Sequence, residues 1–220
     1  MHHTTKYDDQ FNLVPFYNKY PEYLPFVGKG FQDHSKILLL GESHYLPKES
    51  TCQQNPLIWC NSTSVRLSNN ELAWINTRRV VNNIHGESKP KPQKWKPTRT
   101  IYRNVEAAMI ASGMPKNDNL FSHVAFMNAF QRPAEKTGDS IKVHKIYIEQ
   151  SIAVINHVID IIKPNHICFV STKASKYLSG LLNIKSDSVS HPASPWWNRK
   201  SKKGVSREIF IDLLKKYSSN

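Results

Sequence analysis

The sequence predicts an α/β protein, a three-layer αβα sandwich with a central, mostly parallel sheet of four strands. Short apolar segments alternate with segments of helical periodicity, which is the pattern of parallel sheets connected by helices. The apolar segments are continuous rather than alternating, as is typical of strands buried on both faces. The chain has 220 residues, a length that suits one domain with a full core.

Residues 1–35 predict an aromatic N-terminal arm with one short helix, packed on a single domain that spans residues 36–220. The arm is rich in Phe, Tyr and Pro and has little periodicity. The first strand follows at residues 37–40, an Ile-Leu-Leu-Leu run that Gly41 ends.

The middle of the chain predicts two helices and a second strand. Residues 72–84 and 101–111 have helical patterns, and Gly113 and Pro115 end the second helix. Between them, residues 86–100 contain four Lys and three Pro, which favours a long loop, and long loops are often functional. The second strand, residues 124–127, ends at Asn128.

The last third predicts a long helix, two strands and two shorter helices. Residues 141–162 contain a helical stripe of isoleucines spaced by four and three residues: Ile148, Ile152, Ile155, Ile159 and Ile162. The third strand is residues 167–170, and a helix over 172–182 follows. A short strand at 188–190 leads to His191, and a helix over 206–217 closes the chain.

The charge of the chain favours a polyanionic partner, with nucleic acid as the first candidate. Thirty Lys and Arg against 17 Asp and Glu give a net charge of +13 and a pI near 9.6, and such cations bind phosphates with release of counterions. Cations and aromatics together suit a surface that follows a nucleic-acid backbone and stacks on bases. The predicted DNA-binding residues are Trp196, Trp197, Arg199, Lys200, Lys202 and Lys203.

Cysteine use and hydropathy predict a monomeric, cytoplasmic protein without a membrane anchor. Three cysteines, Cys52, Cys60 and Cys168, cannot all pair with one another and have no metal-binding spacing. We expect a reducing compartment, no metal and no cofactor. No apolar run approaches the roughly 20 residues that span a bilayer, and the N-terminus lacks a signal-like apolar segment.

Two polar, histidine-bearing motifs each follow a predicted strand. They are residues 41–45 (Gly-Glu-Ser-His-Tyr) and residues 191–195 (His-Pro-Ala-Ser-Pro). Parallel sheets bind ligands beyond the carboxyl ends of their strands, so these loops can meet in one pocket despite their separation in sequence. The candidate catalytic residues are Glu42, Ser43, His44 and His191.

These motifs resemble those of the uracil-DNA glycosylase superfamily. Its first motif reads Gly-Gln-Asp-Pro-Tyr, or Gly-Glu-X-Pro-Gly in some branches. Its second reads His-Pro-Ser-Pro before an apolar residue, here with one residue inserted. The family also has an apolar strand that ends in a base-reading Asn, which matches Asn128. Arg132 and Pro133 resemble an Arg-Pro pair of some branches. The resemblance covers residues 36–200 and implies a DNA glycosylase.

The resemblance also implies roles for the residues that bind substrate. Tyr45 matches a position that crowds the pyrimidine C5 atom, and Trp59 resembles the segment that supplies a stacking aromatic. Trp196 or Trp197 fills the gap left by the flipped nucleotide. The substrate-binding set is Tyr45, Trp59, Asn128, Arg132 and Ser194. At the position of the family's water-orienting Asp or Asn this chain has Ser43, so Glu42 or His44 takes the role, or activity is weak, altered or absent.

The chemistry of such a site follows from the charges that develop during bond cleavage. Breaking an N-glycosidic bond leaves negative charge on the base and positive charge on the sugar, so a donor at a base oxygen stabilises the transition state most. His191 supplies that donor. A carboxylate near the sugar holds a water and offsets the cationic charge, and Glu42 is the one acid in the first motif.

Two other functions remain open from the sequence. The chain can be a nucleic-acid-binding module without catalysis, which explains the charge and the missing Asp. It can also be a small-molecule hydrolase with a Glu/His pair, since the first motif looks like that of erythromycin-esterase-like proteins. Asn128 can equally cap a loop, and Trp59, Trp196 and Trp197 can belong to the core.

Overall fold

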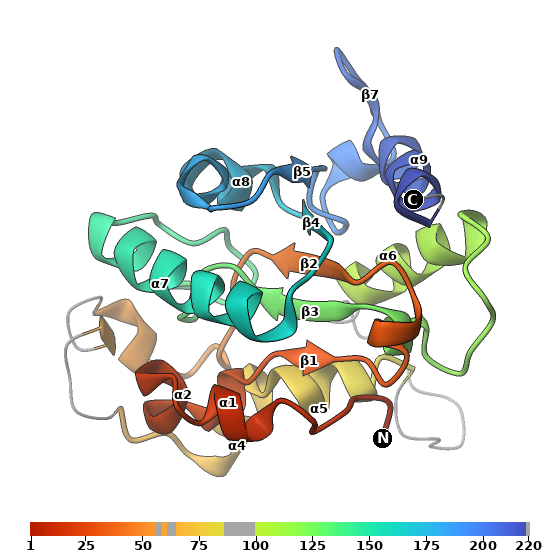
Figure 1. Ribbon diagram of the computed structural model, residues 1–220. Helices are drawn as coiled ribbons and strands as arrows, with labels where there is room; N and C mark the ends of the chain where they lie inside the picture. The colour runs from red at the N-terminus through yellow and green to blue at the C-terminus, as the bar shows by residue number, and fades with distance from the viewer. Residues whose placement is uncertain (56–58, 61–64, 86–99, 219–220) are drawn as a thin grey trace, which may run out of the picture.

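The computed structural model describes residues 1–55, 59–60, 65–85 and 100–218 (Figure 1). Apart from Thr100, the segment that the sequence places in a lysine-rich loop, residues 86–100, lies outside these residues. Among the described residues, no helix is both long and apolar enough to cross a membrane.

The central sheet has five strands in the order β1-β3-β2-β4-β5. The strands are β1 (Phe26–Val27), β2 (Ile37–Gly41), β3 (Ala125–Asn128), β4 (His166–Phe169) and β5 (Ser186–Ser188). All neighbours pair in parallel except β1, which pairs antiparallel with β3. The α/β class and the mostly parallel sheet are therefore confirmed, whereas the expected number of four strands is wrong. The last strand lies two residues earlier than predicted.

The additional strand comes from the N-terminal arm, which the sequence places outside the sheet. The arm forms α1 (Asp8–Phe11), α2 (Pro15–Lys19) and the 3-10 turn η1 (Pro21–Tyr23) before β1. Its aromatic side chains are buried in the same core cluster as α7 and the inner strands. A strand of two residues is too short to produce an alternating pattern, and so the sequence carried no signal for it.

The longer helices agree with the sequence except at their ends. They are α4 (Asn69–Ile75), α5 (Thr77–Asn82), α6 (Thr100–Ala111), α7 (Lys145–Ile162), α8 (Thr172–Leu178) and α9 (Ser206–Ser218). The helix expected at 72–84 is two helices, because the Asn76 side chain accepts a hydrogen bond from the Arg79 N–H and so caps a new helix. The long helix starts at Lys145 rather than 141.

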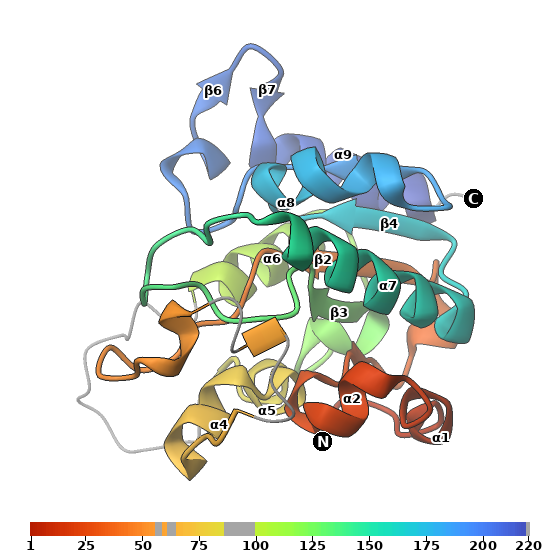
Figure 2. The same ribbon diagram turned by 90° about the vertical axis from the view of Figure 1, so that its left-hand side faces the viewer.

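Helices pack on both sides of the sheet. Leu38 and Leu40 of β2 belong to a core cluster with α7, α8 and the N-terminal arm. Ile37 and Leu39 point the other way, into a second cluster with α6 and α9. Figure 2 looks onto α7 and α8 in front of the sheet, with α9 and α6 behind it.

The register of the parallel strands brings their carboxyl ends to one edge. Gly41 pairs with Asn128, and Phe169 pairs with Ser188. A Cβ at Gly41 would lie 2.3 Å from the Asn128 Oδ1 atom, so any other residue here would displace the Asn128 side chain. A small hairpin of β6 (Lys200–Ser201) and β7 (Gly204–Val205) follows the 3-10 turn η7 (Pro195–Trp197) and projects from the body (Figures 1 and 2).

Candidate active site

The first motif leaves β2 beside the chain that follows β3. The N–H groups of Ala129 and Phe130 donate to the carbonyl oxygens of Gly41 and Glu42, at 3.1 and 2.9 Å. A parallel bridge pairs His44 with Pro133. The backbone of the motif is therefore fixed against the segment that follows Asn128.

The carboxylate of Glu42 is held by hydrogen bonds from two other parts of the chain. Its Oε1 atom accepts from the Ser140 hydroxyl and, at 3.3 Å, from the Ile141 N–H. Its Oε2 atom accepts from the Ser171 hydroxyl at 2.8 Å. Glu42 therefore has a defined place at the carboxyl edge of the sheet.

His191 reaches the same edge from the loop after β5. Its carbonyl accepts from the Ser194 N–H at 2.8 Å, and the Asn104 side chain of α6 donates to the Pro192 carbonyl at 2.7 Å. The His191 Nδ1 atom accepts from the Ala193 N–H at 3.3 Å, so the neutral ring carries its proton on Nε2. The ring thus offers an N–H donor.

The electrostatics of His191 link it to Glu42. Burial lowers the pKa of His191 below 6.5, and the negative charge of Glu42 acts in the opposite direction. Above pH 6.5 the imidazole is therefore mostly neutral. The two loops that are distant in sequence meet at one edge, and the imidazole lies within the field of the carboxylate.

Ser43 has an unusual environment for a polar side chain. Its hydroxyl oxygen is buried, and no hydrogen-bond partner for it is found among the described residues. A buried hydroxyl without a partner costs about 1–3 kcal/mol. Ser43 carries no carboxylate, so it cannot act as the acid of the site.

His44 does not reach the site, which corrects its assignment as a catalytic candidate. Its side chain is 5% exposed, its Nε2 atom lies 3.1 Å from the Thr77 hydroxyl, and its ring packs edge-on against Tyr23. Burial lowers the pKa of His44 to about 3, against a weaker opposing effect of a backbone hydrogen bond to Trp74. His44 is a neutral core residue.

Trp59 and Arg132 also belong to the core rather than to a substrate pocket. Trp59 has no exposed surface, and its ring stacks on Tyr20 at 5.2 Å between centroids. Arg132 is 1% exposed and donates to the Pro133 and Gln53 carbonyls and to the Tyr147 hydroxyl. Neither side chain has a free surface for a base.

Tyr45, Asn128 and Ser194 remain near the edge that carries Glu42 and His191. Burial raises the pKa of Tyr45, and the charge of Glu42 adds to this effect, which places the phenol near the carboxylate. Asn128 ends β3, and no hydrogen bond to its side-chain amide is found within the described part of the chain. Ser194 is partly exposed in the His191 loop.

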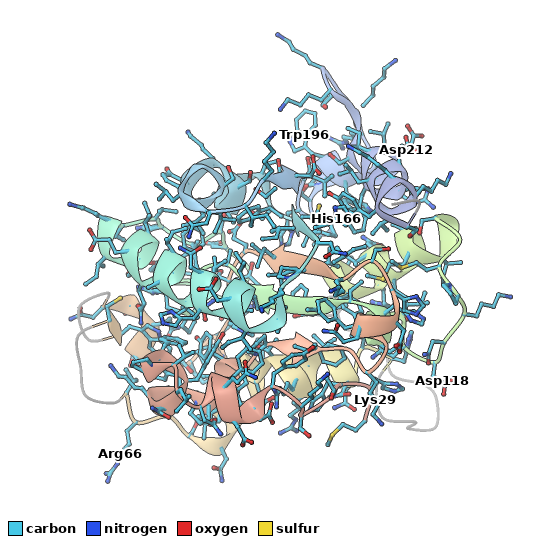
Figure 3. The ribbon with its side chains drawn as sticks, viewed as in Figure 1. Lys29, Arg66, Asp118, His166, Trp196 and Asp212 are labelled. Carbon is cyan, nitrogen blue, oxygen red and sulfur yellow. The ribbon has the colours of Figure 1, made fainter. Side chains whose placement is uncertain are left out.

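The two tryptophans after the second motif have different environments. Trp197 is 1% exposed and packs against Phe210 of α9, so it anchors the loop and is not available to DNA. Trp196 is 56% exposed and lies on the outer side of the molecule near the hairpin (Figure 3). The predicted cations Arg199, Lys200, Lys202 and Lys203 are all exposed on or beside the hairpin.

Three polar residues at this edge escaped the sequence analysis. Ser171 lies just after β4 and caps α8. Its place at the end of a predicted strand, like that of Glu42, could have identified it from the sequence. Ser140 lies in the irregular segment before α7, and Asn104 lies on α6, where no sequence pattern marks a site.

A separate hollow of about 610 Å³ opens at the opposite edge, where β2 and β4 begin. Its walls include His34, His123, His166 and Tyr217, and none of the predicted site residues lines it. No cluster of three potential metal ligands occurs among the described residues. We place the candidate site at the carboxyl edge, because the strands that lead to Glu42 and His191 both end there.

The comparisons with known proteins leave the family open. No protein-family model matches the chain, and no curated protein matches it.

Proposed function

We propose that this protein is a DNA glycosylase that hydrolyses the N-glycosidic bond of a flipped uracil or modified base. The observation that carries the proposal is that the strands leading to Glu42 and His191, which lie about 150 residues apart, end at the same edge of a mostly parallel sheet, where the charge of Glu42 acts on the imidazole. The helices on both sides of the sheet support the three-layer αβα arrangement that the sequence predicts.

In this proposal His191 stabilises the departing base. Its Nε2–H donates to a carbonyl oxygen of the base, where negative charge grows as the bond to the sugar breaks. A neutral ring can perform this task, since Nδ1 accepts from the Ala193 N–H and Nε2 keeps the proton that it donates. The base leaves with the bonding electron pair, and the donor hydrogen bond strengthens as that charge develops.

Glu42 acts on the sugar side. Its carboxylate offsets the positive charge of the sugar and orients a water that attacks C1′. The new C–O bond replaces the C–N bond, and the proton of the water passes to Glu42. Asn128 and Tyr45 hold the base, because an amide offers both a donor and an acceptor to a base edge.

The exposed cations and Trp196 supply affinity for DNA. Lysines on a projecting hairpin reach phosphates without moving the core, and Trp196 is the tryptophan available to fill the gap left by a flipped nucleotide. We propose that the protein acts as a monomer in the cytoplasm. Its three free cysteines support a reducing compartment.

Burial of His44 weighs against the small-molecule hydrolase. That function needs Glu42 to act with His44, whereas His44 contacts Thr77 and Tyr23 in the core.

A non-catalytic binding module is the remaining alternative to the glycosylase. Incubation of the protein with oligonucleotides that carry uracil or another modified base, followed by alkali, distinguishes the glycosylase from the binding module. Strand breaks support the glycosylase, and tight, salt-sensitive binding without breaks supports the module.

Replacing Glu42 by Gln is expected to slow excision by about a hundredfold, since an amide cannot take the proton of the water. Single-turnover release of the base measures this. The matched test is Ser43→Asp in the Glu42→Gln background, which moves the acid to the position that the resembling family uses. Restored excision by the double variant would show that an acid at position 43 can take over the task, whereas full excision by Glu42→Gln alone would overturn the role of Glu42.

Reversing the charges of Lys200 and Lys202 to Glu is expected to weaken DNA binding equally for every sequence. It should also reduce the slope of log K against log salt by about two, one for each lost phosphate contact. Titration of labelled DNA at several salt concentrations measures both. The control reverses Lys6 and Lys29, which are exposed residues of the N-terminal arm, and Figure 3 shows Lys29 far from Trp196. Equal losses from both pairs would contradict a hairpin interface.

A further inference from the structure

We propose that Ser140, Ser171 and Lys173 are positioning residues that hold the carboxylate of Glu42 in one orientation beside His191. The inference rests on the proposed function, because it assigns these side chains to the carboxylate that orients the attacking water. We call the three residues the Glu42 clamp. They come from two elements: Ser140 precedes α7, whereas Ser171 and Lys173 begin α8.

The Glu42 clamp engages both oxygens of the carboxylate from different directions. Ser140 and the Ile141 N–H bind Oε1, and Ser171 binds Oε2. Contacts to both oxygens fix the rotation of the carboxylate as well as its position. An unrestrained Glu side chain loses rotamer freedom when it is ordered, and the clamp does this ordering before substrate binds.

Lys173 links the two residues that bind the Oε1 atom of Glu42. Its ammonium donates to the Ser140 hydroxyl at 3.1 Å and to the Ile141 carbonyl. It therefore binds the same two residues that bind Oε1 of Glu42. Because Ser171 caps α8 and Lys173 lies in its first turn, the clamp joins the start of α8 to the segment before α7 through the carboxylate.

The direction of each hydrogen bond identifies the form of Glu42 that the clamp accepts. The Ser140 oxygen accepts from Lys173, and the Ser171 oxygen accepts from the Ala174 N–H at 3.2 Å. Each hydroxyl therefore has its proton left to donate to Glu42. The clamp presents only donors to the carboxylate, and so it is built for the ionised, acceptor-only form that offsets positive charge on a sugar.

The clamp also explains how an acid at position 42 can replace one at position 43. The Glu42 carboxylate binds Ser140 and Ser171, whereas the buried Ser43 hydroxyl has no partner among the described residues, so the two side chains have different surroundings. The longer side chain of Glu42 has to be directed, and the Ser140 and Ser171 hydroxyls and the Ile141 N–H do this.

Ser140→Ala is the cleanest test, because Ser140 caps no helix. We expect the single-turnover rate of base release to fall by about 10- to 100-fold, with the affinity for DNA within twofold of the unchanged protein. Ser140→Thr keeps the hydroxyl and should restore most of the rate. The matched control is Thr137→Val in the same segment, which removes a hydroxyl that donates to the Leu46 carbonyl and does not touch Glu42. Equal losses in Ser140→Ala and Thr137→Val would overturn the clamp.

A second measurement needs no enzymatic activity. The NMR titration of the His191 ring reports the nearby carboxylate, since Glu42 raises the pKa of His191. We expect a lower pKa for His191 in Glu42→Gln, a shift toward that value in Ser140→Ala, and no shift in Ser140→Thr or Thr137→Val. This pattern without base release would refute the glycosylase and keep the clamp geometry. Base release with unchanged rate and titration in Ser140→Ala would refute the clamp alone.

Discussion

Replacing His191 by Ala is expected to slow base release by at least about a hundredfold while DNA affinity stays within about twofold. The imidazole offers its Nε2–H because Nδ1 is occupied by the Ala193 N–H. Loss of one preorganised donor to a developing oxyanion costs 100- to 1000-fold in rate, or about 3–4 kcal/mol. The affinity should change little, because the donor matters most after charge has moved onto the base.

Single-turnover excision and titration of uncleaved DNA measure these two quantities separately. His157→Ala is a suitable control, since His157 is exposed on α7 and bonds only to the Ala153 carbonyl of its own helix. His191→Gln keeps an N–H donor and should retain more activity than His191→Ala. Full excision by His191→Ala would remove His191 from the mechanism.

The second large effect is a loss of stability in acid that arises from His44. Burial lowers the pKa of His44 in the folded state to about 3, whereas an unfolded chain binds the proton near pH 6.5. The unfolded state therefore takes up more protons below pH 6.5, and stability falls as the pH is lowered from there toward 3. Between pH 7 and pH 5 this residue alone should cost about 2 kcal/mol.

Urea unfolding at several pH values tests this expectation. A His44→Gln variant should start less stable at pH 7, because it loses the packing against Tyr23, but its stability should depend less on pH. His157→Gln, which changes an exposed histidine, should leave the pH dependence intact. NMR offers a direct check: the His44 ring should not titrate between pH 7 and pH 5 in the folded protein. Parallel pH dependence in His44→Gln and the unchanged protein would exclude His44 as the cause.

The elements that the sequence predicted well are those whose burial shows in the pattern itself. The continuous apolar runs identify β2, β3 and β4, since a strand buried on both faces needs apolar side chains on both sides. The isoleucine stripe identifies α7 in the same way. By contrast, β1 has two residues, and α4 and α5 separate at a cap formed by Asn76, so neither feature alters the apolar pattern.

The residues of the candidate site were likewise predictable only in part. Strand ends pointed to Glu42 and His191, because parallel strands finish at a common edge. They pointed equally to His44 and Arg132, which the structure buries among Tyr23, Thr77 and Tyr147. Position in the chain indicates where a residue leaves a strand. It does not indicate whether the side chain enters the core or faces the candidate site, since both environments accept a ring or a guanidinium with hydrogen-bond partners.

The sequence by itself determined the α/β class, the three central strands, and the two polar loops beyond them, because burial of apolar side chains leaves a periodic record in the chain. Only the tertiary structure decided which polar side chains meet. Ser140 and Ser171 reach Glu42 across about 100 and 130 positions, and Trp196 is exposed while its neighbour Trp197 is not. Such contacts depend on the packing of several elements at once, and no local pattern of residues encodes them.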